Sequence, residues 1–79
     1  MYKFKISTRK NKKYDVYKNS SYLLSFGDRR YQHYKDNTNL KSWAKLDHND
    51  KKRRDNYYSR FGRDAKIDTA KWFSHKYLW

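Results

Sequence analysis

The chain has 79 residues, a formal net charge of +13 at pH 7 and an aromatic content of 20%. This length allows one small domain, residues 1–79, and the lack of cysteine excludes disulfides and thiolate metal sites. No segment approaches the ~20 apolar residues of a membrane-spanning helix, so we expect no membrane partner.

Few aliphatic side chains are available for a core. Leu, Ile, Val and Phe contribute 12 of the 79 residues, less than the ~20% below which a highly charged chain is expected to be disordered. Nine Tyr and three Trp offset this deficit, because each buries a large area when its polar atom finds a partner. We therefore expect a folded domain with a thin, largely aromatic core and no cofactor.

Residues 2–26 alternate apolar and polar side chains with a period of two, which predicts three antiparallel strands in a meander. Polar turns are expected at residues 8–13 and 19–21, and Asn11 can take a positive φ in the first of them. The residues predicted to line the apolar face are Tyr2, Phe4, Ile6, Tyr14, Val16, Tyr22, Leu24 and Phe26.

After Gly27 the spacing becomes helical, and residues 28–79 are predicted to form three or four short helices packed on one face of the sheet. The first is a short turn that Asp28 caps. A second short amphipathic helix is expected around Trp43. This order of elements, strands first and helices after, is typical of the α+β class.

A longer basic helix is predicted to begin at Asp47 as N-cap and to end at Phe61, with Gly62 following as the C-terminal cap. Tyr57 and Phe61 lie four residues apart and are expected to face the sheet. Asp68 or Thr69 is predicted to cap the last helix, on which Ala70, Phe73 and Tyr77 share a face.

Residues 25–36 (SFGDRRYQHYKD), 46–54 (LDHNDKKRR) with 58–61, and 73–74 with the closing 78–79 carry a resemblance. They resemble a family of small, basic, functionally uncharacterised proteins encoded by large DNA viruses of algae and protists and by some phages. The resemblance covers roughly residues 12–79 and implies a viral setting without implying a chemistry. Family members often carry a His at position 61, where this chain has Phe61. Because of this departure, the resemblance supports no histidine catalysis at that position.

Two clusters of basic residues are the candidate nucleic-acid contacts. One is expected on the tip of the first hairpin and the other along the basic helix. A Lys or Arg that neutralises a phosphate releases counterions, so such binding is salt-dependent and largely blind to sequence. The candidates are Arg9, Lys10, Lys12, Lys13, Lys51, Lys52, Arg53, Arg54, Arg60 and Arg63.

These clusters favour a non-enzymatic viral structural protein that binds genome nucleic acid inside the virion, in many copies. The same charge would also suit a minor capsid or cement protein that binds an acidic capsid surface. A nucleic-acid-binding regulator in the host cytoplasm or nucleus is a third interpretation, and it would need base contacts to discriminate among sequences.

Two aromatic residues are candidates for contacts outside the core. Tyr17 falls on the polar side of its predicted strand, where its ring could stack on a base. Trp79 ends the sequence and could anchor in a neighbouring subunit as an interface hot spot.

A metal-dependent nuclease is the remaining alternative. The 47–50 segment, DHND, weakly resembles the start of an HNH motif, in which His48 would be the base and Asn56 would orient it. His75 or Asp68 would then bind a divalent ion. His48 is predicted at a helix start without the strand pair of that motif, so we expect Asp47 and Asp50 to act as helix caps and expect no metal.

Overall fold

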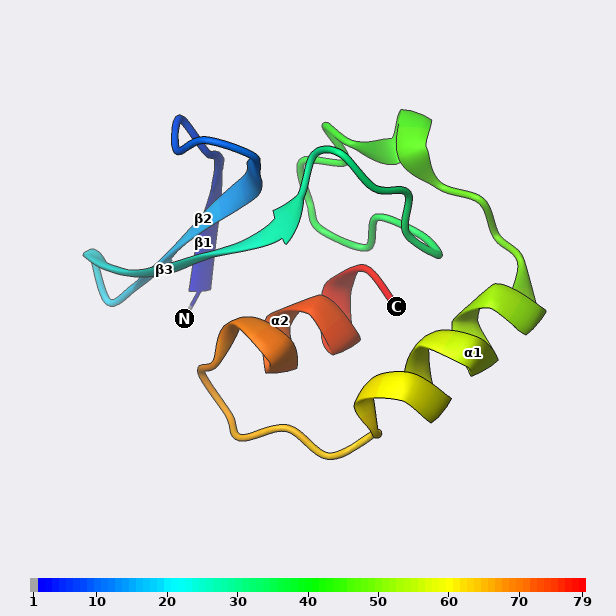
Figure 1. The fold of residues 1–79 in the computed structure, drawn as a ribbon. Helices are drawn as coiled ribbons and strands as arrows, with labels where there is room; N and C mark the ends of the chain where they lie inside the picture. Colours follow the sequence, from blue (N-terminus) through cyan, green and yellow to red (C-terminus); the bar gives the residue numbers. More distant parts are fainter. Residues whose placement is uncertain (1) are drawn as a thin grey trace.

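The computed structural model describes residues 2–79, in which the predicted meander is present (Figure 1). Strands β1 (Tyr2–Ile6), β2 (Lys12–Lys18) and β3 (Ser21–Asp28) form one antiparallel sheet in the order β1-β2-β3. The turn before β2 places Asn11 at φ 61°, as expected. The second turn places Asn19 and Ser20 at φ 51° and 71°.

The core lies on one face of this sheet and is mostly aromatic. Phe4 pairs with Val16, and Tyr14 pairs with Phe26, so these side chains share the inner face. Phe73 joins them from the last helix, stacked 5.6 Å from the Phe26 ring. The buried hydrophobic residues are Tyr14, Val16, Phe26, Phe73 and Leu78. The expected thin aromatic core is confirmed.

Two of the predicted core residues lie elsewhere. A bulge shifts the register, so Val16 pairs with Leu24 but Tyr17 pairs with Tyr22. Tyr22 is therefore on the outer face and 42% exposed. Ile6, at the end of β1, is 55% exposed. Strict alternation fails here because one extra residue in a strand reverses the face of everything beyond it.

Residues 29–50 contain no α-helix, so the helices predicted there are wrong, although Asp28 caps a turn as expected: its Oδ1 accepts from Arg30 N at 2.9 Å. Only a 3-10 turn, Ala44–Leu46, is formed. His33 instead makes a parallel bridge with Asp47, in which His33 N donates to Leu46 O at 3.2 Å and His48 N donates to His33 O at 2.9 Å. These long-range backbone bonds replace the helical ones.

The two α-helices end where the sequence indicates, but one begins later than predicted. Helix α1 (Lys51–Phe61) has Asp50, not Asp47, as N-cap, and Asp50 accepts from Lys52 N and Arg53 N. Gly62 ends it at φ 78°. Helix α2 (Ala70–Tyr77) is capped by Thr69, one of the two predicted residues.

Among residues 2–79, α2 is the helix that packs against the sheet; its backbone approaches β3, and its Tyr77 ring also lies 4.7 Å from the Phe4 ring of β1. The backbone of α1 does not approach the sheet within the described residues, so the expectation that Tyr57 and Phe61 face it is wrong (Figure 1). Phe61 is 48% exposed. Side chains connect α1 to the rest, above all Tyr57, whose ring stacks on Trp79 with centroids 4.2 Å apart and planes 6° apart.

Candidate nucleic-acid interface

The acidic side chains of this protein are mostly engaged within the fold. All eight acids are Asp, and six of them accept hydrogen bonds from other groups of the chain. Asp50, for example, is held as a helix cap, and Asp68 binds Lys18 at 2.6 Å and the Tyr2 hydroxyl. The six are Asp15, Asp28, Asp36, Asp47, Asp50 and Asp68.

The basic side chains have few acidic partners. Among residues 2–79, Lys18 and Arg30 are the Lys and Arg side chains that form ion pairs with Asp. Many of the others lie over aromatic rings, as Arg9 does over Tyr22 at 4.7 Å and Arg63 over Tyr58 at 4.6 Å. A guanidinium over a ring face still presents N–H groups at its edge, so such residues can bind phosphate where they stand.

Helix α1 presents the larger basic surface. Lys51, Lys52, Arg53 and Arg60 are exposed, as predicted. Arg53 also donates to Gln32 Oε1 at 2.8 Å. Arg54 differs from these, since it is half-buried 4.3 Å from the centre of the Tyr34 ring. Arg63 lies beyond the end of the helix and is exposed.

The hairpin cluster is smaller than predicted. Arg9 and Lys10 are exposed in the turn between β1 and β2, and Lys12 is exposed as the first residue of β2. Lys13 is only 2% exposed, so the expectation that it lies on the hairpin tip is wrong. The turn lies across the molecule from α1 in Figure 1, but Lys12 lines a cleft together with Arg53 and Arg60, so the two clusters meet there.

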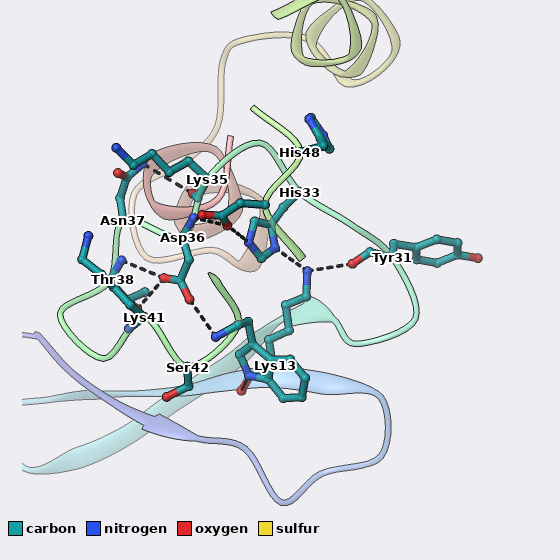
Figure 2. Close-up of polar contacts among 12 residues, drawn as sticks. Lys13, Tyr31, His33, Lys35, Asp36, Asn37, Thr38, Lys41, Ser42 and His48 are labelled. Carbon is teal, nitrogen blue, oxygen red and sulfur yellow. Dashed lines mark hydrogen bonds and ion pairs between the residues drawn. The ribbon is translucent and has the colours of Figure 1, made fainter. Parts of the chain in front are cut away.

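Lys13 belongs to a buried chain of polar groups (Figure 2). Its Nζ donates to Tyr31 O at 2.9 Å and to His33 Nδ1 at 2.7 Å. His33 Nε2 lies 2.6 Å from Asp47 Oδ1. With Nδ1 accepting from the lysine, the proton of a neutral His33 is on Nε2, where it is donated to Asp47.

Burial changes the titration of this chain of groups. Desolvation lowers the pKa of Lys13 to about 8, although the nearby Asp28 opposes the shift. Desolvation also lowers the pKa of His33, and the charge of Lys13 adds to that effect. A neutral His33 between a cation and Asp47 agrees with the tautomer assigned above.

A buried carboxylate, Asp36, holds residues 36–43 against Tyr14 of β2. Tyr14 OH donates to Asp36 Oδ2 at 2.5 Å, and Thr38 N and Oγ1 donate to Oδ1 at 2.9 and 2.6 Å. Burial alone would raise the pKa of Asp36, but these hydrogen bonds and one from Trp43 N outweigh it and hold the pKa below its usual value. Asp36 is thus a structural anion, unavailable to an external cation.

Lys13, Asp36 and His33 belong to buried polar contacts that no local sequence pattern predicts. Lys13 and Tyr14 are neighbours in a strand, so their side chains leave opposite faces, yet both are fully buried. Residues 29–50 therefore cover both faces at the start of β2. Lys13 stands between the basic Lys12 and the rest of β2, and nothing in the neighbouring sequence predicts that it is buried.

Of the two aromatic candidates, Tyr17 lies on the open outer face of the sheet. Its ring meets Tyr22 edge-on at 5.8 Å, and Lys5 Nζ lies 4.9 Å from its centre. Trp79 is half-buried between Tyr57 and His48, whose ring centre is 5.2 Å away. Its main contacts are therefore within the chain.

The residues of the nuclease alternative are not assembled. Asp68 is bound to Lys18, and His75 contacts Tyr57 OH at 3.1 Å and Gly62 O at 3.0 Å. His48 Nδ1 accepts from Asp50 N at 3.0 Å, while its buried Nε2 has no hydrogen-bond partner. No group of three metal-ligating side chains gathers within residues 2–79.

A cleft of about 780 Å³ opens between α1, α2 and the end of β3. Basic and aromatic side chains line most of it, including Arg53, Arg60, Lys71 and Phe61. Arg53 and Arg60 are predicted nucleic-acid contacts, whereas the places of Lys71 and Phe61 beside them are evident only from the structure.

Comparisons with known proteins found no match to this chain among family models, curated proteins or solved structures. Over the described residues, no helix is long and apolar enough to cross a membrane.

Proposed function

We propose that this chain binds nucleic acid through the phosphate backbone, as a small non-enzymatic structural protein. The observation that carries the proposal is the unequal use of charge. Six of eight Asp side chains are bound within the fold, whereas two of the 21 Lys and Arg side chains pair with Asp among residues 2–79. The surface is therefore left strongly positive, and a polyanion is its natural partner.

The geometry supports a backbone-binding mode. The exposed cations are spread over α1 and the hairpin turn and are held over rings or in solvent. Phosphate contacts of this kind position a protein on nucleic acid without specifying sequence. The resemblance to small viral proteins favours a packaged genome as the ligand, bound by many copies.

The test is fluorescence anisotropy with a random-sequence duplex at salt concentrations from about 50 to 200 mM. The main variant neutralises Lys51, Lys52 and Arg60 together by substitution with Gln. Arg53 and Arg54 stay unchanged because they contact Gln32 and Tyr34, and their loss would also disturb the fold.

A matched control replaces three exposed lysines outside both clusters, Lys35, Lys41 and Lys66, with Gln. It removes the same charge. We expect steep salt dependence for the native protein, and a slope shallower by up to about three in the α1 variant. The control should change the slope less. Negligible binding at 50 mM salt would overturn the proposal and leave an acidic capsid surface as the partner.

A further inference from the structure

The cleft between α1 and α2 has the volume of a ligand site. Its volume of about 780 Å³ lies within the ~300–1,000 Å³ of typical small-molecule pockets. Its lining comes from α1, from α2 with residues 78–79, and from the start of β2 and the end of β3.

Aromatic side chains with exposed surface line the cleft. Phe61 is 48% exposed at the end of α1, and Tyr31 is 64% exposed after β3. Tyr57 and Trp79 stack together and extend the same lining. Exposed aromatic rings are the usual stacking surface for unpaired bases, and stacking tolerates any base because every base has a π face.

The charge of the cleft complements an anion. Lys12, Arg53, Arg60 and Lys71 lie around it, and all four are exposed. The one acid in the lining, Asp28, is bound by Arg30 at 2.8 Å. A ligand that carries both a flat ring and a phosphate is the chemistry that uses both features.

Polar groups are also present for the edge of a base. Asn56 of α1 and Ser74 of α2 are both in the lining, and Gln32 accepts a hydrogen bond from Arg53 there. An amide offers both donors and an acceptor, so these groups can bind a base edge without strong selectivity.

We propose that the cleft holds one unpaired nucleotide of a bound single strand. The base stacks on Phe61, and its flanking phosphates contact Arg60 and Lys71. This inference rests on the proposed function and deepens it, because it assigns single-stranded nucleic acid to the cleft, in addition to the backbone contacts of the basic surface.

The experiment compares a labelled single strand with a labelled duplex that carries the same number of phosphates, at one salt concentration. Phe61→Ala removes the stacking ring, and Phe61→Trp keeps one. Ile67→Ala is the matched control, since Ile67 is 70% exposed and lies outside the cleft lining. Circular dichroism checks that the variants keep their helices.

We expect Phe61→Ala to weaken single-strand binding about tenfold and to leave duplex binding unchanged. Phe61→Trp and Ile67→Ala should bind both ligands as the native protein does. Equal loss on both ligands, or no loss on either, would overturn the cleft proposal while leaving backbone binding intact. Failure of the native protein to bind either ligand would instead overturn the proposed function.

Discussion

Lys13 Nζ donates a hydrogen bond to His33 Nδ1 across 2.7 Å, and both side chains are almost completely buried. Through His33 the contact continues to Asp47, so strand β2 and residues 29–50 are connected by a chain of ionisable groups. A buried cation is disfavoured relative to its state in water. The stability of this protein should therefore depend on pH through these groups.

The first prediction concerns Lys13 at alkaline pH. The pKa of Lys13 is about 8 in the folded protein, whereas the ordinary value for a lysine, which applies to the unfolded chain, is 10.5. Between these two values the unfolded chain therefore binds more protons. The free energy of unfolding therefore rises with pH in that window. Lys13→Met should lack this rise, whereas Lys35→Met, at an exposed position, should keep it.

Urea unfolding at pH 7.5, 8.5 and 9.5 measures the effect. The series stops below pH 10 because burial raises the pKa of Tyr57 to about 12 and also raises that of Tyr14. Those tyrosines stay protonated longer in the folded state, so they lower stability as pH rises above 10. Equal pH slopes for the native protein and Lys13→Met would contradict the prediction.

The second prediction concerns His33 at mildly acidic pH. Desolvation, followed by the charge of Lys13, lowers its pKa below the reference value of 6.5. The unfolded state then binds more protons than the folded state, so stability falls as pH falls below 6.5. The Gln side chain in His33→Gln can still hydrogen-bond to Lys13 and Asp47 but does not titrate. The stability of this variant should therefore fall less than that of the native protein as the pH falls.

The measurement is the thermal midpoint of the native protein and His33→Gln between pH 7 and 5. A smaller decline is expected, not a flat profile, because burial also lowers the pKa of His48 and His75. The range ends above the pH at which Asp36 and Asp68, whose pKa values are lowered, would begin to take up protons. Identical declines for the two proteins would count against the prediction.

Local sequence patterns predicted the parts of the fold that local physics determines. The meander follows from the alternation of apolar and polar side chains. Gly62 and Thr69 could be predicted as caps because residues of these types satisfy the backbone groups that helix ends leave unpaired. Residues 29–50 follow from contacts far apart in the chain, such as Tyr14 with Asp36 and Lys13 with His33. Such contacts override the weak helical spacing of that segment.

The candidate site divides in the same way. The exposed charge of α1 could be predicted from the sequence, because four consecutive basic side chains on a short helix cannot all be buried. The cleft could not be predicted from the sequence, because Phe61 and Lys71 come to line it only through the way α1 and α2 are placed. Asp47 was misread as a cap because Asp50, three residues later, offers the same local signal.

The third prediction compares two glycines that share φ 78°. A Cβ at Gly27 would lie 3.0 Å from the Cβ and Cδ of Lys13 and 3.1 Å from Leu78 Cδ1, whereas a Cβ at Gly62 would meet nothing within 4 Å. Gly62→Ala should cost about 1–3 kcal/mol of stability from backbone strain alone, because φ 78° with ψ 161° is a conformation that only Gly adopts readily. Gly27→Ala adds a clash in a packed region, which should cost a further ~1–3 kcal/mol.

Urea denaturation of both variants at pH 7 gives the two free energies of unfolding. The two glycines share φ 78°, so a larger loss at Gly27 is assigned to the clash. A similar loss at both positions would show that Lys13 and Leu78 can move away from a methyl group, and that the start of β2 is less tightly packed than described.

The fourth prediction concerns the stacked rings of Tyr57 and Trp79, which hold α1 beside the cleft. The backbone of α1 approaches neither the sheet nor α2 among residues 2–79. Its other side-chain contacts include Tyr58 OH to His75 O at 3.2 Å and Arg54 over Tyr34. An aromatic pair contributes about 0.5–1.5 kcal/mol beyond the area it buries, so this stack should dominate the placement of the helix.

Trp79→Ala should therefore speed hydrogen exchange of the α1 amides about tenfold or more and leave the amides of β2 and β3 protected. Trp79→Phe keeps a smaller stack and should give an intermediate rate. The same Trp79→Ala protein should bind single strands more weakly, because one wall of the cleft is no longer fixed, while its duplex binding stays close to native. Unchanged α1 exchange would mean that the contacts of Tyr58 and Arg54 suffice to hold the helix.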